Sequence, residues 1–462
     1  MFRKLIAAVA TAAISVFWVT PAAQAVPVEP AFTAININSM WNNNIRGQGV
    51  SIAMIDQGVN LQHPYFVGQV ADGFCYYQPT TNARCPNGTR SQTGIAAASQ
   101  RRTAAGTLIA EESHGNMVAG LVAGKPNAQA PGGLAPQAKI VMANTDMQPD
   151  SVVRALEFFY ANREKYNIVA ISMSFGILGL TSRQDLLNCN TNPVYNQVRA
   201  SLRKLRSAGI IPFAAAGNGY YLNSVESWAP TCLDEAVSIG SVDSNGQISI
   251  YNTMSTKVEL LAPDYAVTAA TVGYQRASGT SAAAPMVAAS FALLRQQFPN
   301  RSGEEVLEAM KISGKKLDDV VRKQIPMVDL AAAQALLAGP ATTTSPVVPT
   351  PTPTTSAPVT PTNPPVTPEP ETAPKKITVG TFNGFIAVYV QGFEGKHFAA
   401  KIAGKWTMVP VLQNVAGKPY ALVRRNTGAG FDVRVEVWID GAKQPLTVAN
   451  SIVGTSVTVR TR

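Results

Sequence analysis

The chain has 462 residues, of which 46% are hydrophobic and 14% are charged, so it is long enough for two or three domains with a large core. Its formal net charge is +10, but twelve Lys and Arg against four Asp and Glu give residues 375–462 a charge of +8. Apart from +2 in residues 1–25, the rest of the chain is close to neutral. We therefore expect no nucleic-acid partner, and any preference for anionic partners belongs to the C-terminal part.

Residues 1–25 have the three-part pattern of a secretory signal peptide. Arg3 and Lys4 give a positive start, residues 5–19 are apolar, and Ala23-Gln24-Ala25 fits a small-residue cleavage site. A membrane anchor is the alternative, but this apolar run is shorter than the roughly 20 residues that span a bilayer. We expect cleavage after Ala25 and a secreted, extracellular protein without a transmembrane anchor.

The chain has four cysteines, an even number that suggests disulfides in an exported protein. Three pairings are open, and loop position favours Cys75–Cys85 and Cys189–Cys232. A zinc site is the rival interpretation, but the spacings contain no CxxC pair and few histidines lie nearby. We predict no metal at these cysteines.

Residues 26–339 alternate between strand-like and helix-like segments. Such alternation predicts an α/β domain with a parallel sheet covered by helices on both faces, and ligands bind beyond the carboxyl ends of its strands. The strand-like segments are short apolar runs that end at Gly, Asn or Asp. They are residues 49–58, 138–145, 167–176, 209–218 and 235–242.

Two of the intervening segments have helical spacing. Residues 150–166 begin with Asp150 or Ser151 as the expected N-cap, and residues 192–209 end at Gly209. The expected apolar faces are Val153, Leu156 and Tyr160 in the first helix, and Val194, Val198, Leu202 and Leu205 in the second.

Residues 340–374 contain twelve prolines and eleven threonines, which predicts an extended Pro/Thr-rich linker that cannot bury a core. Threonines at this density are candidate sites for sugars. Residues 375–462 follow with about seven short alternating runs separated by Gly-rich turns. They predict a basic, small all-β domain, sandwich-like or barrel-like.

Three polar residues stand where a core would not place them. Asp56 follows the apolar run SIAMI, and His114 enters a helical segment. Ser281 lies in SGTSAAAPMVAA (278–289), at the mouth of a helix that is apolar all round. Each has a structural alternative as a turn residue or a helix cap. The chain order Asp, His, Ser is also one of the known orders of a nucleophilic triad.

At these positions the chain resembles the subtilisin-like serine proteases, or subtilases. IDQGVNLQHPYF (55–66) is similar to the family's aspartate motif, HGNMVAGLVAG (114–124) to its histidine motif, and SGTSAAAPMVAA to its serine motif. AAAGN (214–218) is similar to the stretch with the oxyanion asparagine. The resemblance covers residues 36–338 and implies a subtilisin-like fold and a serine endopeptidase that acts on proteins or peptides.

The resemblance assigns each residue a role. Ser281 is the nucleophile, His114 the general base and Asp56 the residue that orients the imidazole. Asn218 and the backbone N–H of Ser281 donate to the oxyanion. Of the other two histidines, His63 matches a structural turn of the family, and His397 lies in the C-terminal domain.

The resemblance also implies how substrate binds. Ser174, Phe175 and Gly176 are similar to the edge segment that pairs with an extended peptide, a case of β-augmentation. Ala215, Ala216 and Gly217 are similar to one wall of the primary specificity pocket. Trp228 lies near the expected pocket floor, which suggests a shallow pocket for small P1 side chains.

The chain also departs from the family pattern. Only about 24 residues separate Ala25 from the first catalytic strand, so latency by a folding pro-domain is doubtful. Gln57 stands where the family more often has Ser or Thr, and Ala282 where it more often has Met. Neither position takes part in the chemistry. Residues 71–112 are longer than the family minimum. They are either a passive surface insertion or a segment that gates the cleft, with a candidate cleavage site at Arg101-Arg102. We predict no cofactor, and calcium binding stays open because no carboxylate cluster is evident.

Two further interpretations compete with a secreted endopeptidase. One is a non-catalytic or conditionally latent cell-surface binding protein that keeps the subtilase scaffold. The other is a dedicated processing protease of a secretion system. We expect a monomer, and the basic C-terminal domain suggests binding to an anionic cell-wall polymer, although a merely solvated basic face explains its charge equally well.

Overall fold

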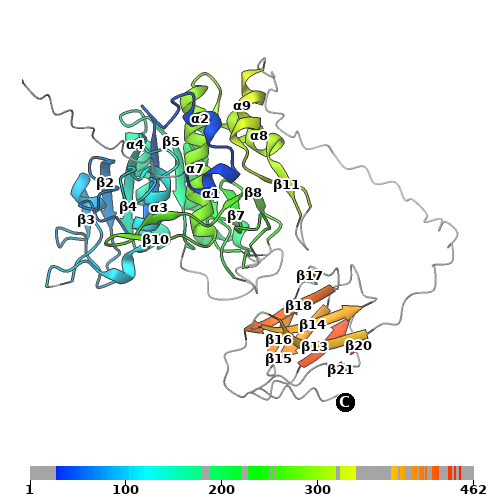
Figure 1. The fold of residues 1–462 in the computed structure, drawn as a ribbon. Helices are drawn as coiled ribbons and strands as arrows, with labels where there is room; N and C mark the ends of the chain where they lie inside the picture. Colours follow the sequence, from blue (N-terminus) through cyan, green and yellow to red (C-terminus); the bar gives the residue numbers. More distant parts are fainter. Residues whose placement is uncertain are drawn as a thin grey trace, which may run out of the picture.

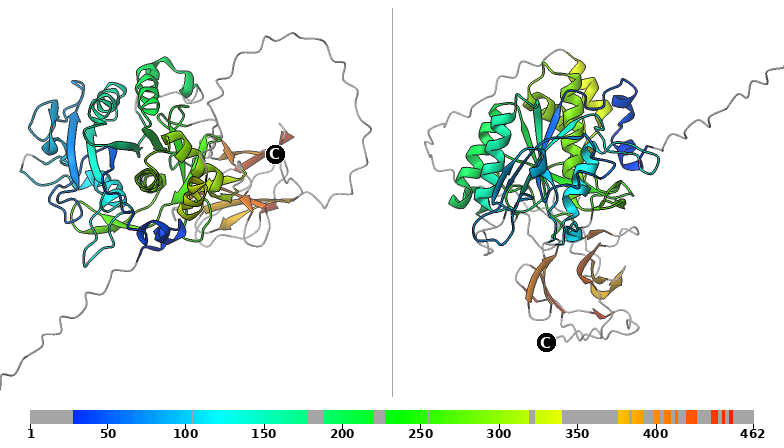
Figure 2. Two further views of the ribbon diagram at one scale, coloured as in Figure 1. Left: turned by 90° about the horizontal axis from the view of Figure 1, so that it is seen from above. Right: turned by 90° about the vertical axis from the view of Figure 1, so that its left-hand side faces the viewer.

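A computed structural model describes residues 28–103, 105–177, 188–219, 227–249, 251–253, 255–318 and 323–339, and strands between 376 and 448. The predicted signal peptide (1–25), the Pro/Thr-rich linker (340–374) and the strand-like run 455–462 lie outside the described residues. Residues 28–339 contain a large, mostly parallel sheet with helices on both faces (Figures 1 and 2).

The sheet has ten described strands in the order β11-β12-β8-β7-β6-β5-β1-β4-β2-β3. Neighbours from β12 to β2 pair in parallel, whereas β3 and β11 are antiparallel to their neighbours at the two edges. A separate hairpin joins β9 and β10. The strands are β1 Ser51–Asp56, β2 Val70–Tyr76, β3 Ser91–Thr93, β4 Lys139–Thr145, β5 Ile168–Met173, β6 Ile211–Ala215, β7 Val237–Val242, β8 Val258–Pro263, β9 Val267–Ala269, β10 Tyr274–Arg276, β11 Lys315–Leu317 and β12 Ile325–Met327.

The helices divide between the two faces of the sheet. On one face α7 crosses β1 and β5 to β8 and packs against α3, α8 and α9, while α4 and α6 pack together on the other (Figure 2). The α-helices are α1 Pro30–Ala34, α2 Asn38–Trp41, α3 His114–Ala123, α4 Pro149–Asn162, α6 Asn196–Ser207, α7 Thr280–Gln297, α8 Gly303–Ser313 and α9 Leu330–Ala338. Four short 3₁₀ helices are η1 Ile95–Ala98, η2 Ala110–Glu112, η3 Cys189–Thr191 and η4 Pro193–Tyr195.

Strand β1 shows how the sheet is buried on both sides. Ile52 and Met54 belong to the core on the α7 side, whereas Ala53 and Ile55 belong to the core on the α4–α6 side. Successive side chains of a strand point to opposite faces, so a strand that is covered twice needs a continuous apolar run. The five predicted strands of the domain, including β1, are all present.

Both helical segments are present, but their predicted starts and part of their predicted buried faces were wrong. The N-cap of α4 is Gln148 rather than Asp150 or Ser151, because Pro149 occupies the first turn, where its missing N–H costs nothing. Val153 and Tyr160 are only partly buried, and the buried face instead consists of Ser151, Val152, Ala155, Leu156 and Phe159.

The second helix, α6, begins at Asn196, two residues after Val194. Val194 therefore lies in η4 and is 44% exposed, in contrast to its predicted burial. Val198, Leu202 and Leu205 are buried as predicted, and Gly209 follows the helix with a φ of 80°.

The C-terminal strands form two described sheets. One has the order β17-β18-β14-β13-β21 and the other β16-β15-β19-β20. Six of the seven predicted runs coincide with strands, while the sandwich-like packing stays a prediction. The strands are β13 Lys376–Phe382, β14 Phe385–Gln391, β15 Phe398–Ile402, β16 Lys405–Val409, β17 Leu412–Gln413, β18 Pro419–Arg425, β19 Val435–Ile439, β20 Ala442–Lys443 and β21 Thr447–Val448.

The close approach of α3 to the loop after β1 depends on two glycines. A Cβ on Gly115 would lie 2.0 Å from the carbonyl oxygen of Gly58, and Gly58 itself has a φ of 81°. This approach brings the first residue of α3, His114, to the end of β1.

We predict that Gly115→Ala destabilises the domain, although alanine favours an isolated helix by about 1 kcal/mol. The added methyl group meets backbone that cannot rotate away, and such overpacking costs about 1–3 kcal/mol or more. The measurement is the free energy of unfolding in urea. Ser113→Ala is the control, because the Ser113 side chain makes no capping hydrogen bond. A more stable Gly115→Ala variant would contradict the contact.

Candidate active site

The predicted site residues gather at the carboxyl edge of the parallel sheet. Asp56 ends β1, Ser174 follows β5, and Gly217 follows β6. Since β1, β5 and β6 are successive neighbours in the sheet, their carboxyl ends lie side by side. Helices α3 and α7 pack against each other and begin at this edge, with His114 as the first residue of α3.

Asp56 and His114 form a hydrogen-bonded pair. Nδ1 of His114 lies 2.9 Å from Oδ2 and 3.0 Å from Oδ1 of Asp56. The carboxylate is fully buried, and its Oδ1 also accepts the backbone N–H of Gln57 at 2.8 Å. The charge of Asp56 raises the pKa of His114 above its ordinary value of 6.5, against the opposing effect of burial. With Nδ1 donating to Asp56, Nε2 of the neutral ring is free to act as a base.

Ser281 is the second residue of α7, after the N-cap Gly279, whose φ is 90°. Among the described residues, its hydroxyl donates to the carbonyl oxygen of Ser174 at 3.4 Å, and not to His114. The Ser281 hydroxyl and the His114 ring are therefore not hydrogen-bonded in this geometry. Hydrogen bonds of this kind are often long or poorly aligned without substrate and tighten only in the substrate complex.

A second contact between Ser174 and Ser281 runs in the opposite direction. The Ser174 hydroxyl donates to the backbone carbonyl oxygen of Ser281 at 3.0 Å. Inside a helix this carbonyl would accept the N–H four residues later, but that residue is Pro285, which has none. The end of β5 thus supplies the hydrogen bond that the helix lacks, and it fixes the backbone of Ser281 relative to the sheet.

Asn218 lies beside the first turn of α7. Its Oδ1 accepts two hydrogen bonds from Thr280, from the backbone N–H and from the hydroxyl, both at 2.9 Å. This arrangement leaves the Nδ2 group as a donor on the opposite side of the amide. A Cβ on Gly279 would lie 2.9 Å from that Nδ2, so only glycine fits there. The side chain of Asn218 is oriented by the loop that carries Ser281.

The predicted substrate-binding segments border the same edge. Ser174 is 6% exposed and Gly176 is exposed, with Phe175 between them half-buried. Ala215 and Ala216 are buried, whereas Gly217 is half-buried and donates its N–H to the Thr280 hydroxyl at 3.0 Å. Trp228 packs on this border, because a Cβ on Gly176 would lie 3.3 Å from the Cβ of Trp228.

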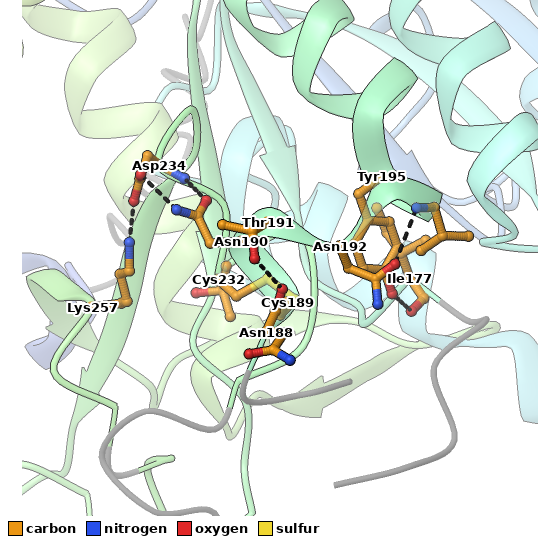
Figure 3. The surroundings of a disulfide bond; sticks show 12 residues. Ile177, Asn188, Cys189, Asn190, Thr191, Asn192, Tyr195, Cys232, Asp234 and Lys257 are labelled. Carbon is orange, nitrogen blue, oxygen red and sulfur yellow. Dashed lines mark hydrogen bonds and ion pairs between the residues drawn. A yellow bond between two sulfur atoms is a disulfide. The ribbon is translucent and has the colours of Figure 1, made fainter. Parts of the chain in front are cut away.

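The structure contains both disulfides that the loop positions favoured, Cys75–Cys85 and Cys189–Cys232. Figure 3 shows the second, which joins η3 to the chain just after Trp228. Beside it, Asn190 donates to the carboxylate of Asp234 at 2.7 Å and accepts the Asp234 N–H at 3.1 Å. The disulfide and this pair of hydrogen bonds hold η3 against the segment that follows Trp228.

Residues 71–112 form part of the sheet and of the buried core of the domain. They supply most of β2 and all of β3, and Ala97 and Ala98 of η1 are fully buried. Arg101 pairs with Glu112, two residues before His114, and its guanidinium lies 5.3 Å from the centre of the Tyr77 ring. The candidate cleavage site at Arg101 is therefore held by an ion pair and an aromatic ring.

His63 has the structural role that the sequence indicated. Its Nδ1 accepts the backbone N–H of Tyr65 at 3.1 Å, so Nε2 carries the proton and donates to the carbonyl oxygen of Gly273 at 2.7 Å. Burial lowers its pKa below the ordinary value, which favours this neutral form. Both ring nitrogens are occupied, so His63 is not available as a base.

Sequence reasoning missed Tyr251 and Asp264, which connect to the loop before Ser281 through the Gly279 N–H on Tyr251. Asp264 directly follows β8 and is 5% exposed, and it accepts hydrogen bonds from Ser249 and Tyr251. The signal that singled out Asp56, an acidic residue after an apolar strand, also applies to Asp264.

Among the described residues, no group of three or more His, Cys, Asp or Glu could hold a metal ion. Calcium binding stays open.

None of the helices that the structure describes combines the length and the apolar character that a bilayer span needs.

Comparisons with known proteins agree with this architecture. The model of the subtilase family matches residues 47–325. The minor extracellular protease Epr of Bacillus subtilis (strain 168) is 26% identical over 286 residues, which cover 60% of this chain and 37% of that protein. Subtilisin NAT of Bacillus subtilis subsp. natto is 25% identical over 297 residues, covering 63% of this chain and 66% of that protein. The chain thus spans less than two thirds of the length of either relative.

A solved structure of proteases from Pseudoalteromonas arctica PAMC 21717 has the same fold. It superposes with a TM-score of 0.53 and 21% sequence identity, and the match covers 66% of this chain and 94% of that one.

We predict that Asp56→Asn slows the reaction of Ser281 with a fluorophosphonate probe by roughly 10²–10⁴-fold, the range of general-base contributions. The wild-type rate should fall as the pH drops through the raised pKa of His114, since the protonated ring is no base. Without the Asp56 charge the pKa of His114 should be lower, so the rate should fall only at lower pH. Asp150→Asn, an exposed carboxylate paired with Arg154, is the control. If Asp56→Asn keeps the wild-type labelling rate and its pH dependence, the pairing of Asp56 with His114 is refuted.

Proposed function

The chain belongs to the subtilase family, and from that premise we propose that it is a secreted serine endopeptidase with Ser281 as nucleophile. The observation that carries the proposal is the buried Asp56 carboxylate on Nδ1 of His114, at the sheet edge where α7 presents Ser281. Fold alone does not imply activity, but this arrangement supplies a base, its orienting group and a nucleophile in one place.

In the proposed reaction Oγ of Ser281 attacks the scissile carbonyl carbon while Nε2 of His114 takes the hydroxyl proton. The Asp56 carboxylate stabilises the imidazolium that forms. The carbonyl oxygen becomes an oxyanion, which accepts hydrogen bonds from Nδ2 of Asn218 and the backbone N–H of Ser281. The positive end of α7 points at the same position. Collapse of the intermediate passes the proton to the leaving amine, and water then hydrolyses the acyl-enzyme.

The substrate is proposed to lie as an extended strand along residues 174–176, with its backbone paired to that edge and its P1 side chain beside residues 215–217. Ser174 is buried beside Ser281, whereas Gly176 is exposed, so the segment leads from the nucleophile outward. Trp228 packs on Gly176 and supports a shallow pocket that prefers small P1 side chains.

Export is proposed from two further observations. The domain contains two disulfides, which persist in oxidising compartments. One relative is named as an extracellular protease.

The basic charge of residues 375–462 supports a proposal that this part holds a monomeric enzyme on an anionic cell-wall polymer, with the Pro/Thr-rich linker as a spacer.

The competing function is a binding protein that keeps the scaffold without catalysis. The contact that favours it is the Ser281 hydroxyl on the Ser174 carbonyl rather than on His114. Reaction with a fluorophosphonate separates the two, because only an activated hydroxyl reacts.

We predict that wild-type protein is labelled by the fluorophosphonate and cleaves peptides, and that Ser281→Ala abolishes both. Ser278→Ala is the matched control, an exposed serine three residues earlier in the same loop, and it should retain both activities. The measurements are probe incorporation and hydrolysis of a fluorogenic peptide library. A folded wild type that takes up no probe would favour the binding protein.

We predict cleavage after Ala in preference to Phe or Tyr, and a gain of roughly 10-fold or more for Phe in Trp228→Ala, the size expected when a pocket admits additional methylene groups. The measurement is kcat/KM for two peptides that differ only at P1. The Ala peptide is the internal control, since its rate should change little in the variant. Efficient cleavage after Phe by the wild type would exclude the shallow pocket.

A further inference from the structure

A chain of hydrogen bonds leads from a buried carboxylate to the loop that carries Ser281. The hydroxyl of Tyr251 donates to Oδ2 of Asp264, and its oxygen accepts the backbone N–H of Gly279 at 3.0 Å. The Ser249 hydroxyl donates to the same Oδ2 at 2.5 Å. These residues come from three places in the sequence: the segment after β7, the end of β8 and the N-cap of α7.

The direction of this chain is fixed by its chemistry. The Gly279 N–H can only donate, so the phenol oxygen must accept from it, and the phenol O–H then donates to Oδ2 of Asp264. Burial and the neighbouring Asp264 raise the pKa of Tyr251 to about 12, so the phenol keeps its proton near neutral pH. Asp264 is 5% exposed, and two hydroxyl donors hold its carboxylate.

Tyr251 and Asn218 hold two successive N–H groups of the loop. Gly279 donates to Tyr251, and Thr280 donates to Oδ1 of Asn218. The next N–H along the chain belongs to Ser281, which is the proposed oxyanion donor. The Ser281 N–H belongs to the next peptide plane, and Thr280 and Ser281 are the first two residues of α7. With the two preceding planes held, the helical dihedral angles of this first turn set the direction of the third N–H. Gly279 permits this path with its φ of 90°.

We infer that Tyr251 and Asp264 are positioning residues that aim the Ser281 N–H and the Asn218 amide at the oxyanion. The inference rests on the proposed endopeptidase function. It assigns neither residue a contact with substrate. Tyr251 acts through Gly279, and Asp264 acts through Tyr251.

Tyr251→Phe removes the phenol oxygen and leaves the ring in place. We expect kcat to fall roughly 10- to 100-fold with KM little changed, since small misplacement of catalytic groups costs up to about 10²-fold. The inhibition constant of a peptide aldehyde, whose adduct places an oxygen in the oxyanion position, should rise by the same factor as kcat/KM falls. A residue that serves only folding would lower the melting temperature without this parallel change.

One further variant and two controls sharpen the test. Asp264→Asn should lower kcat by itself but add nothing in the Tyr251→Phe background, because both act through one chain of hydrogen bonds. Tyr265→Phe is the matched control, the same chemical change next to Asp264, and should behave as wild type. Asn218→Ala is the positive control for loss of an oxyanion donor. It should lower kcat by about 10²–10³-fold, the range typical of removing one such donor.

The result that would overturn the inference is a Tyr251→Phe enzyme with wild-type kcat and aldehyde affinity. A lower melting temperature with unchanged kinetics would do the same. If Tyr251→Phe does not fold, Asp264→Asn carries the same test. Wild-type protein that fails to react with a fluorophosphonate would refute the proposed function, and the inference with it, before any of these variants is compared.

Discussion

The reciprocal contact between Ser174 and Ser281 joins the two halves of the site. Pro285 removes one backbone hydrogen bond from the first turns of α7, and an unsatisfied buried carbonyl costs about 1–3 kcal/mol. The Ser174 hydroxyl satisfies that carbonyl from the end of β5. Because the rest of α7 is buried along the sheet, the helix cannot shift without losing both its packing and this bond. Ser281 is thereby held to the same sheet that carries Asp56.

The geometry at the carboxyl edge of the sheet depends on close contacts between neighbouring helices and loops. Gly115 approaches the Gly58 backbone so closely that no side chain fits, and this contact brings His114 to Asp56. Gly279 makes a similarly close approach to the side chain of Asn218. His114 and Asn218 are thus next to glycines at which a side chain would meet neighbouring atoms.

The sequence indicated most of the fold because buried strands need continuous apolar runs, as in β1 and β5. Strands β2 and β8 were missed, since Asp72 and Gly73 interrupt one and Glu259 the other. Their position is set by pairing with neighbours. The triad candidates followed from three local motifs. The orientation of the Ser281 hydroxyl did not, because a rotamer depends on surroundings. The contact between Tyr251 and Asp264 joins separate loops, and no local pattern encodes it.

The Cys189–Cys232 disulfide joins two cysteines that lie 43 positions apart in the chain. A single peptide-bond break between these cysteines would leave two pieces joined through sulfur. The severed ends would remain at high effective concentration, because the cross-link and the buried core on either side keep them from diffusing apart. Damage in this part of the molecule would therefore be silent on a non-reducing gel and would appear as two fragments only after a thiol reductant is added.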